Sequence, residues 1–381
     1  MSHPARLDVP EPVLAIARRL EDAGFETWCV GGAVRDTLLG EPNADFDLAT
    51  AATPDDIIGL FRRTVPVGVE HGTVAVLDPD GGLHEVTTFR RDVETDGRHA
   101  VVRFGVSLDD DLARRDFTIN AIAYHPTRYE WRDPFDGRSD LTRGVIRAVG
   151  DPESRVREDY LRILRALRFS ARFGAGIEPA TWAAMVANVD GLHHLSAERV
   201  RDEWFKGLTS ARSRAVLVAA WRAVGALAIW LPELRIDGDI DRLPVDPVLI
   251  TAFLSSDPAA TLTRLKASRA EVDRGRAIGV LRALPLPPPD DAGRVRRFLS
   301  TLGPRADDVL AIAGDPALDE AARRVRASGA PLTLADLAVT GHDLVARGLS
   351  GPEVGAALRR LLDEVLDDPA RNEREYLLTR V

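Results

Sequence analysis

The sequence predicts an α+β protein in which a region of mixed strands and helices precedes a wholly helical remainder. Up to about Asp151, short strand-like runs alternate with short helical ones. Beyond that point, long segments rich in Ala, Leu and Arg repeat with helical period. Because 381 residues are too many for one ordinary domain, this shift in composition marks a domain boundary.

The first predicted elements are a helix, a strand and a short second helix. Residues 11–23 carry apolar side chains at helical spacing and end at Gly24, a typical helix stop. The apolar run at 27–30 predicts a buried strand, and Gly31 and Gly32 follow it as a turn into the next helix.

The next elements are a second strand, a third helix and a hairpin. A strand is expected over residues 45–50. Thr53 and Pro54 then begin a helix as N-cap and first-turn proline. Residues 72–78 and 83–89 are expected to form two strands, because an Asp-Gly-Gly turn separates them.

The remaining segments are interpreted as follows. Residues 90–102 are charged and rich in turn formers, so we expect a mobile loop. Helical patterns resume over 108–124 and 155–172. The proline-rich stretch 284–293 cannot form a regular helix and is expected to join two helical subdomains.

Composition excludes several classes of protein. With 50 basic and 59 acidic side chains, the net charge of -9 argues against a uniformly basic nucleic-acid-binding surface, though not against a local basic face. The single cysteine, Cys29, excludes internal disulfides and zinc sites built on paired cysteines. No apolar run approaches the roughly 20 residues of a membrane span, and the N-terminus lacks a signal-peptide core. We therefore expect a soluble, cytoplasmic protein; its oligomeric state is unknown from the sequence.

Paired carboxylates mark the second strand. Alternate side chains of a strand share a face, so Asp45 and Asp47 point the same way. Like charges at this separation destabilise each other unless a cation lies between them, and a hard divalent ion with oxygen ligands meets that need. Glu85 joins the same face if its strand is adjacent. The alternative is a solvated edge strand without a ligand.

A turn suited to anions precedes these carboxylates. Gly31 and Gly32 let backbone N–H groups approach a phosphate closely, and Arg35 lies one helical turn further on. Alone, the two glycines indicate only a tight turn. Followed by an arginine and by paired acids, they predict an anion pocket beside a metal pocket.

Six motifs together resemble one known family. The sequence resembles the class II tRNA nucleotidyltransferase and bacterial poly(A) polymerase family, and its C-terminal segment 341–362 is more loosely similar to the tail of the CCA-adding members. The motifs are GGAVRDTLLG (31–40), DFDLAT (45–50), EVTTFRRD (85–92), RRDFTINA (114–121), DPFDG (133–137) and REDYLRILRALRF (157–169).

The resemblance implies a fold of four parts. A nucleotidyltransferase head with a mixed β-sheet is expected over residues 1–150, followed by a helical neck over 151–210 that carries the nucleobase-reading helix. A helical body over 211–285 and a helical, tRNA-binding tail over 286–381 complete the chain.

The resemblance also implies roles for residues of the head. Asp45 and Asp47 would hold Mg²⁺, and Glu85 would be a third catalytic carboxylate. The nucleotide would be bound by the following residues: Gly31, Gly32, Arg35, Arg115, Asp116 and Asn120, with Arg115 on phosphate or ribose and the last two shaping the sugar pocket. For Arg114 and Asp116, structural salt bridging is the alternative.

The segment 155–172 carries the prediction of base selectivity. On one helix, Asp159, Arg162 and Arg165 would be spaced three apart, and Arg168 continues the series. Cytosine and adenine present an amine donor beside a ring-nitrogen acceptor, whereas uracil and guanine present the reverse order. An accepting Asp and a donating Arg therefore fit C and A. In the family this helix serves as a template for the base; without the family, the same face is a solvated salt-bridge ladder.

The resemblance implies that CTP and ATP are used to add CCA to the 3′ end of tRNA without a nucleic-acid template. Candidates to hold the acceptor arm are Arg201, Lys206, Arg212 and Arg214. Alternatives with the same chemistry are a poly(A) polymerase or a partial enzyme that adds only CC or only A. An alternative of another class is a catalytically inactive, RNA-binding helical protein, which would have no reason to keep both carboxylates and the base-reading pair.

Overall fold

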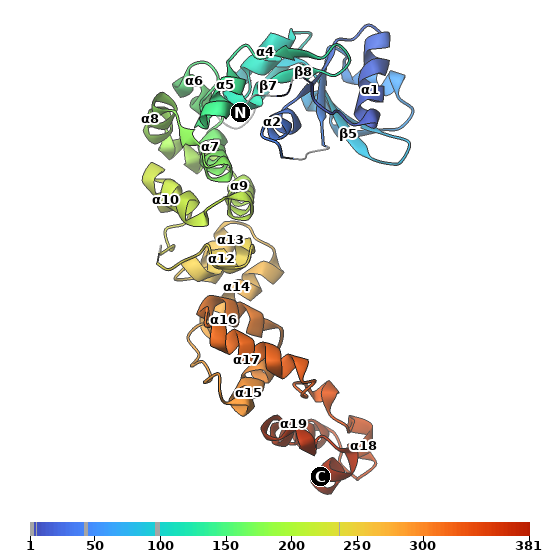
Figure 1. Ribbon diagram of the computed structural model, residues 1–381, viewed down its shortest axis with the longest axis vertical. Helices are drawn as coiled ribbons and strands as arrows, with labels where there is room; N and C mark the ends of the chain where they lie inside the picture. Colours follow the sequence, from blue (N-terminus) through green and yellow to red (C-terminus); the bar gives the residue numbers. More distant parts are fainter. Residues whose placement is uncertain (1–3, 5, 42–44, 96–99, 236) are drawn as a thin grey trace. The chain divides into compact units, whose positions relative to one another are not determined.

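The computed structural model describes residues 4, 6–41, 45–95, 100–235 and 237–381 (Figure 1). The chain forms two compact units, Met1–Pro232 and Glu233–Val381. The first unit holds the strands and the helices directly after them, and the second is helical. The α+β class expected from the sequence is confirmed. The four-part division with boundaries near residues 150, 210 and 285 stays a prediction.

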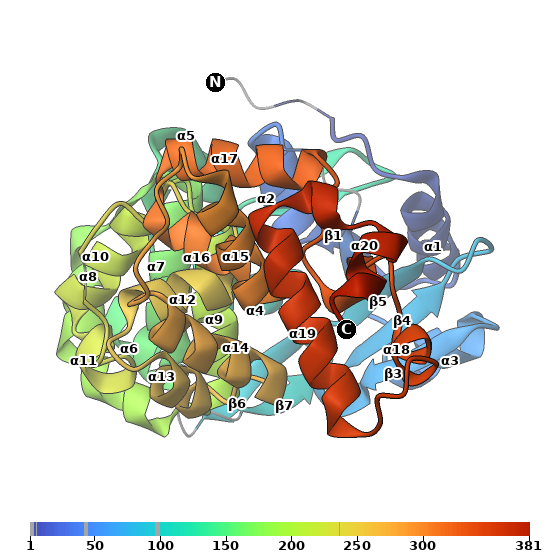
Figure 2. The ribbon, with the colours of Figure 1, turned by 90° about the horizontal axis from the view of Figure 1, so that it is seen from below.

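A seven-stranded sheet forms the centre of the first part of the chain. Its strand order is β3-β4-β5-β2-β1-β8-β9, and only the β2–β5 pair is parallel, so the sheet is mixed as expected. Figure 2 shows β3, β4 and β5 side by side. The strands are β1 (Thr27–Val30), β2 (Asp47–Thr50), β3 (Thr64–Gly68), β4 (Thr73–Leu77), β5 (Leu83–Thr88), β8 (Ala123–His125) and β9 (Glu130–Arg132).

The expected strand at 45–50 is two residues shorter in the structure. β2 begins at Asp47, so Asp45 lies just before the strand and is exposed. Phe46 and Leu48 are buried, as the alternation predicts. The β2–β5 register aligns Leu48 with Val86, which confirms that the strand carrying Glu85 is adjacent.

The expectation of a loop over residues 90–102 is wrong, because the structure has two strands in this segment. It contains β6 (Arg90–Thr95) and β7 (Ala100–Phe104), which pair antiparallel as a separate two-stranded sheet. Backbone hydrogen bonds between the strands make this pairing, and a charged, turn-rich segment does not signal them. Residues 96–99 lie outside the described residues.

Two helices expected from the sequence are interrupted. The first expected helix, 108–124, is α-helical only in α4 (Leu108–Ala113). After it, Phe117 pairs with Ala148 in an isolated bridge, residues Thr118–Asn120 form a short 3-10 helix, and β8 joins the sheet. The second, 155–172, is divided into α6 (Pro152–Glu158) and α7 (Leu161–Phe173). Asp159 is extended between them (φ -154°, ψ 105°), and its side chain accepts the backbone N–H of Leu161. This local bond offers the backbone an alternative to continuing the helix.

Further helices of the first unit cover the sheet and continue after it. α7 packs on α9 and α10, with Trp204 and Trp221 buried edge-to-face between helices. A short parallel pair, β10 (Val145–Ile146) and β11 (Gly176–Ile177), lies at the base of α7. The other helices are α1 (Glu11–Asp22), α2 (Gly32–Leu38), α3 (Pro54–Leu60), α5 (Gly137–Arg143), α8 (Pro179–Ala187), α9 (Ala197–Ser210), α10 (Arg214–Val224) and α11 (Ala226–Trp230).

The second unit is helical in every described element. One core lies among α15, α16 and α17, and another among α18, α19 and α20. Residues 284–291 contain no helix, as the prolines predict. The helices are α12 (Pro247–Leu254), α13 (Pro258–Arg264), α14 (Arg269–Leu281), α15 (Ala292–Leu302), α16 (Ala306–Ala313), α17 (Pro316–Ala327), α18 (Gly341–Val345), α19 (Pro352–Asp367) and α20 (Arg374–Thr379).

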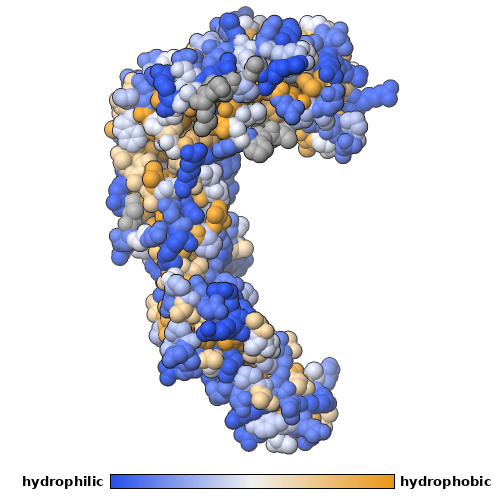
Figure 3. All heavy atoms as spheres, in the orientation of Figure 1, coloured by the Kyte–Doolittle hydropathy of each residue, from blue (hydrophilic) through white to orange (hydrophobic). Residues whose placement is uncertain are grey.

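The surface is mainly hydrophilic on the face shown in Figure 3, where hydrophobic residues appear in small groups. Among the described helices, none has both the length and the apolar character that crossing a membrane requires.

Candidate active site

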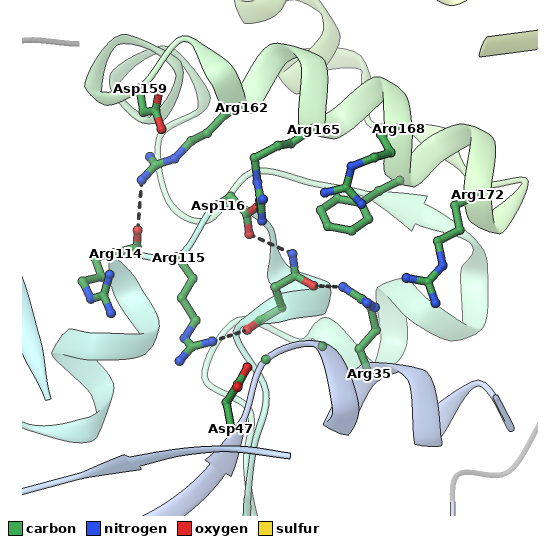
Figure 4. A pocket seen from close by; sticks show the side chains of 14 residues that line it. Arg35, Asp47, Arg114, Arg115, Asp116, Asp159, Arg162, Arg165, Arg168 and Arg172 are labelled. Atoms are coloured by element: carbon green, nitrogen blue, oxygen red, sulfur yellow. Dashed lines mark hydrogen bonds and ion pairs between the residues drawn. The ribbon is translucent and has the colours of Figure 1, made fainter. Parts of the chain in front are cut away.

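A cavity of about 500 Å³ opens in the first unit between α2, the start of β2 and α7 (Figure 4). Seven arginines and three aspartates line it, so it is strongly positive and suits a polyanionic ligand. The lining residues are Gly31, Gly32, Arg35, Asp47, Arg114, Arg115, Asp116, Asn120, Asp159, Arg162, Arg165, Arg168, Phe169 and Arg172.

Gly31 lies in the cavity wall, close to the carboxylate of Asp47 and the guanidinium of Arg115. Its backbone has φ 78° and ψ -138°, which residues with a Cβ avoid. A Cβ there would lie 3.4 Å from Arg115 Nη1 and 3.5 Å from Asp47 Oδ2. A Cβ at these distances would make ordinary contacts, so the positive φ rather than lack of space favours glycine at this position.

Three carboxylates meet at the start of β2. Burial, together with the nearby charges of Glu85 and Asp45, raises the pKa of Asp47 to about 6, and the charge of Arg115 acts in the opposite direction. Asp45 and Glu85 are exposed and do not line the cavity, but both act on Asp47. In the part of the chain that the structure describes, no three acidic, histidine or cysteine side chains form a complete metal-binding cluster. A cation here would need ligands from substrate as well.

The segment after α4 supplies a hydrogen-bonded network to the floor of the cavity. Asn120 Nδ2 donates to Asp116 Oδ1 at 2.8 Å, and Arg115 Nη1 donates to the Asn120 carbonyl at 3.3 Å. Burial would raise the pKa of Asp116, but the charge of Arg165 and the Asn120 hydrogen bond lower it to about 2. Arg115 Nε is buried and has no hydrogen-bond partner among the described residues. That donor is suited to a ligand oxygen.

Arg35 is almost completely buried. Its residue is 4% exposed, and burial lowers the pKa of its guanidinium. It donates to Asp36 Oδ1 through Nε at 2.7 Å and to Asn120 Oδ1 through Nη1 at 2.5 Å. Nη2 also lies 2.7 Å from Asp36 Oδ1, so all three guanidinium nitrogens have a partner before any ligand binds and Arg35 is held in a fixed orientation at the edge of the cavity.

The polar face of α7 forms the opposite wall. Arg162, Arg165 and Arg168 point into the cavity, as their spacing predicts (Figure 4). Arg165 pairs with Asp116 at 2.6 Å, and Arg168 Nε donates to Glu203 of α9 at 2.5 Å.

Asp159 reaches the same cavity from outside the helix. The expectation that it shares one continuous helix with the arginines is wrong, because the chain is extended at Asp159. The break directs the side chain into the cavity beside Arg162 (Figure 4). Arg199 of α9 pairs with Asp159 Oδ2 at 2.7 Å and holds the carboxylate in place.

The structure brings together all of the predicted nucleotide-binding residues. All ten of them line the one cavity: Gly31, Gly32, Arg35, Arg115, Asp116, Asn120, Asp159, Arg162, Arg165 and Arg168. The four cationic residues predicted to hold tRNA do not line it; Arg201, for example, pairs with Asp202.

Several residues that shape the cavity were missed. Arg172 continues the face of α7, seven residues after Arg165, and helical spacing could have found it. Arg199 and Glu203, four residues apart on α9, hold pocket residues from a helix distant in sequence. No local pattern signals such partners.

Two family models match the chain. The poly A polymerase head domain matches residues 27–147, and a probable RNA and SrmB-binding site of polymerase A matches residues 175–236.

Whole-chain relatives carry a more specific name. The CCA-adding enzyme of Lacticaseibacillus paracasei is 35% identical, covering 98% of this chain and 97% of its own. That of Limosilactobacillus fermentum is 36% identical, covering 97% of this chain and 95% of its own.

Solved structures agree with the sequence relatives. The Bacillus stearothermophilus CCA-adding enzyme in complex with CTP has a TM-score of 0.79 and 33% identity, with 97% of both chains covered. The Thermotoga maritima CCA-adding enzyme complexed with tRNA has a TM-score of 0.70 at 20% identity and supports the fold. The head-domain match, the full-length relatives and the nucleotide-sized, arginine-lined cavity lead to one conclusion: the chain belongs to the CCA-adding enzymes, a family of nucleotidyltransferases.

Proposed function

We propose that this chain adds CCA to the 3′ end of tRNA, taking CMP from CTP and AMP from ATP in the cavity of its first unit. The observation that carries the proposal is that one cavity joins a carboxylate, an arginine-rich wall and an Asp–Arg pair. These are the groups that a metal, a triphosphate and a base require, respectively.

Base selection is assigned to Asp159 and Arg162. Each oxygen of Asp159 already accepts one hydrogen bond, and a carboxylate oxygen has room for a second, here from the exocyclic amine of C or A. Arg162 donates to the Arg155 carbonyl, to Glu158 and to the Arg114 carbonyl, which uses three of its five N–H groups. A remaining N–H is available to the ring nitrogen. Uracil and guanine would leave these buried groups unpaired.

The triphosphate is assigned to the cationic side of the cavity. Arg115 offers a buried, unpartnered Nε close to Asp47, and Arg35 offers its remaining N–H groups beside the Gly31 turn. Guanidinium groups bind phosphate oxygens in paired, planar geometry. The α-phosphate would then lie between the carboxylates of β2 and the arginines.

We assign Mg²⁺ to Asp45 and Asp47, with Glu85 as a third catalytic carboxylate. The donors fit because they are hard oxygens. Burial and two neighbouring acids also destabilise the ionised form of Asp47, and a bound cation would offset that effect. When bound, Mg²⁺ would make the 3′-hydroxyl more acidic and neutralise charge on the departing pyrophosphate. The chain's own groups orient the nucleotide and exclude mispaired bases, so that the oxygen of the 3′-hydroxyl faces the α-phosphate.

The test is extension of tRNA that lacks CCA, with each nucleotide supplied singly and together. We expect two C residues from CTP, one A only after them, and no incorporation of UTP or GTP. Long homopolymer from ATP on generic RNA would favour the poly(A) polymerase, and extension that stops at CC or begins only on CC ends would favour a partial enzyme.

The inactive RNA-binding alternative is tested by the same preparation. CTP binding that does not depend on magnesium, together with no extension of any tRNA, would favour it. We also infer a cytoplasmic location, supported by a single, buried, unpaired cysteine.

A further inference from the structure

Asp36 lies behind the cavity and holds two of its arginines. It is 5% exposed and does not line the cavity. Its Oδ1 accepts from Arg35 at 2.7 Å, and its Oδ2 accepts from Arg172 at 3.0 Å. Arg35 belongs to α2 and Arg172 to the last turn of α7. One carboxylate therefore connects the glycine turn of the head with the base-reading helix.

The connection continues through the cavity floor to a second point on the same helix. Arg35 donates to Asn120, Asn120 donates to Asp116 at 2.8 Å, and Asp116 pairs with Arg165 at 2.6 Å. Arg165 and Arg172 are seven residues apart, so they lie on one face of α7 two turns apart. The helix is thus fixed at both places by one continuous network, with Asp36 at one end of it.

Aromatic packing makes the position of Arg35 depend on α7 as well. Its guanidinium carbon is 5.0 Å from the ring centroids of both Phe169 and Phe173. These rings are stacked, with centroids 5.9 Å apart and planes 6° apart. Arg172 lies over the second ring at 4.9 Å. Arg35 and Arg172 are thus among the guanidinium groups that gather at this aromatic pair, and the carboxylate of Asp36 offsets the repulsion between these two.

We propose that Asp36 is a positioning residue for base selection. By holding Arg35 and Arg172 together, it fixes the register of α7 against α2 and keeps Arg162 aligned with the base. The proposal rests on the proposed function of the cavity as a CTP and ATP site. Loss of the Asp36 charge should let α7 shift. A matched base would then lose hydrogen bonds, whereas binding of a mismatched base, which makes few of them, would change little.

The test is equilibrium binding of CTP, ATP and UTP to Asp36→Asn in the full chain. We expect the Kd for CTP and ATP to rise about tenfold, the scale of one lost hydrogen bond to a charged group. The Kd for UTP should rise less, so the CTP:UTP affinity ratio falls. Binding does not require turnover, so wild-type protein that binds CTP without extending tRNA would overturn the proposed function and leave this comparison valid.

Glu41→Gln is the matched control. Glu41 accepts from the same Nη2 of Arg172, at 2.8 Å, and has no described contact with Arg35. Its variant should bind all three nucleotides as wild type does. If Asp36→Asn and Glu41→Gln have the same CTP:UTP ratio, the proposal is overturned.

Asp36→Glu keeps the test decisive if Asp36→Asn does not fold. The longer side chain keeps the charge but cannot hold both arginines in the same geometry. We then expect a smaller fall in the CTP:UTP ratio, at an unchanged thermal midpoint. A wild-type ratio in Asp36→Glu would overturn the proposal in that case.

Discussion

Asp47 is the carboxylate whose ionised form is least stable in the cavity. Burial and two neighbouring acids work against its charge, and Arg115 compensates only in part. Such a group is costly for the fold without a cation and useful only with one. The presence of an aspartate at position 47 is therefore explained by function rather than by its contribution to stability.

Asp47→Asn separates these two effects. Without its charge, transfer to tRNA should fall about 10³-fold or more, the scale of several kcal/mol of lost transition-state stabilisation. Because the pKa of folded Asp47 lies above that of an unfolded aspartate, ionisation opposes folding at high pH. The metal-free variant should thus be as stable as wild type at pH 8, or more stable by up to about 2 kcal/mol. Single-turnover CMP transfer and urea unfolding measure both, and retained transfer would refute the assigned role.

Substituting Asp159 and Arg162 should change which base is selected and leave binding of the triphosphate largely intact. In the double variant Asp159→Ala, Arg162→Ala, incorporation of UTP should approach that of CTP, because no buried group is then left unpaired by the wrong base. Arg162→Lys is the milder comparison, since Arg162 also ties Glu158 and the Arg114 carbonyl. Competition between CTP and UTP measures the ratio. If UTP stays excluded in the double variant, the base-reading assignment fails.

Asp116 predicts a dependence of stability on pH. The pKa of Asp116 is about 2 in the fold, below that of an unfolded aspartate, so its contribution is present above about pH 4 and lost as pH falls towards 2. Asp116→Asn should therefore lower the free energy of unfolding by about 2 kcal/mol at pH 7 and by clearly less at pH 3. Urea titrations at the two pH values compare the deficits. An equal deficit at both would show that the charge of Asp116 is not the cause.

At the scale of elements, the break between α6 and α7 gives the site its geometry. The ring of Tyr160, the residue after Asp159, lies flat against Gly191 in the turn before α9, and His194 packs beside it with ring centroids 5.9 Å apart. A Cβ on Gly191 would meet the Tyr160 ring at 2.2 Å. The break is thus held by packing on a distant segment and by the local bond of Asp159.

Gly191→Ala should move Tyr160 and with it Asp159. We expect a loss of stability of about 1–3 kcal/mol, as for an overpacked core site, and a fall in CTP over UTP selectivity. Gly207→Ala is a useful comparison, because a Cβ there would also overlap a side chain, that of Leu217, far from the cavity lining. Thermal unfolding and nucleotide competition measure the two effects. If both variants lose stability but neither changes selectivity, the break does not position Asp159.

The elements also show what sequence patterns could and could not predict. β1, α1 and the start of α3 follow local signals, namely apolar spacing and an N-cap Thr53 followed by Pro54, and these were predicted. The break at Asp159 was missed because REDYLRILRALRF keeps helical spacing across it. The β6–β7 ribbon was missed because the segment was interpreted from its charged and turn-forming residues alone. The candidate site could be predicted where its residues are adjacent in sequence, and not where Arg199, Glu203 or Asp36 act through a partner.

At the scale of the whole molecule, the nucleotide cavity lies entirely within Met1–Pro232. The second unit has its own cores, and none of its described residues lines the cavity. Domains with separate cores can fold and act separately. The chain is acidic overall, so contact with tRNA must depend on local arginines rather than on net charge.

This division predicts that residues 1–232, produced alone, keep CTP binding and lose tRNA extension. The Kd for CTP should match that of the full chain within about twofold, because all described pocket partners are retained. Extension of tRNA lacking CCA should fall at least about tenfold in kcat/KM, since the tail predicted to bind tRNA is removed, and its dependence on salt should weaken. Binding and extension assays at two salt concentrations measure both. Full extension by the fragment would remove the second unit from tRNA binding, and loss of CTP binding would mean that the cavity depends on residues beyond Pro232.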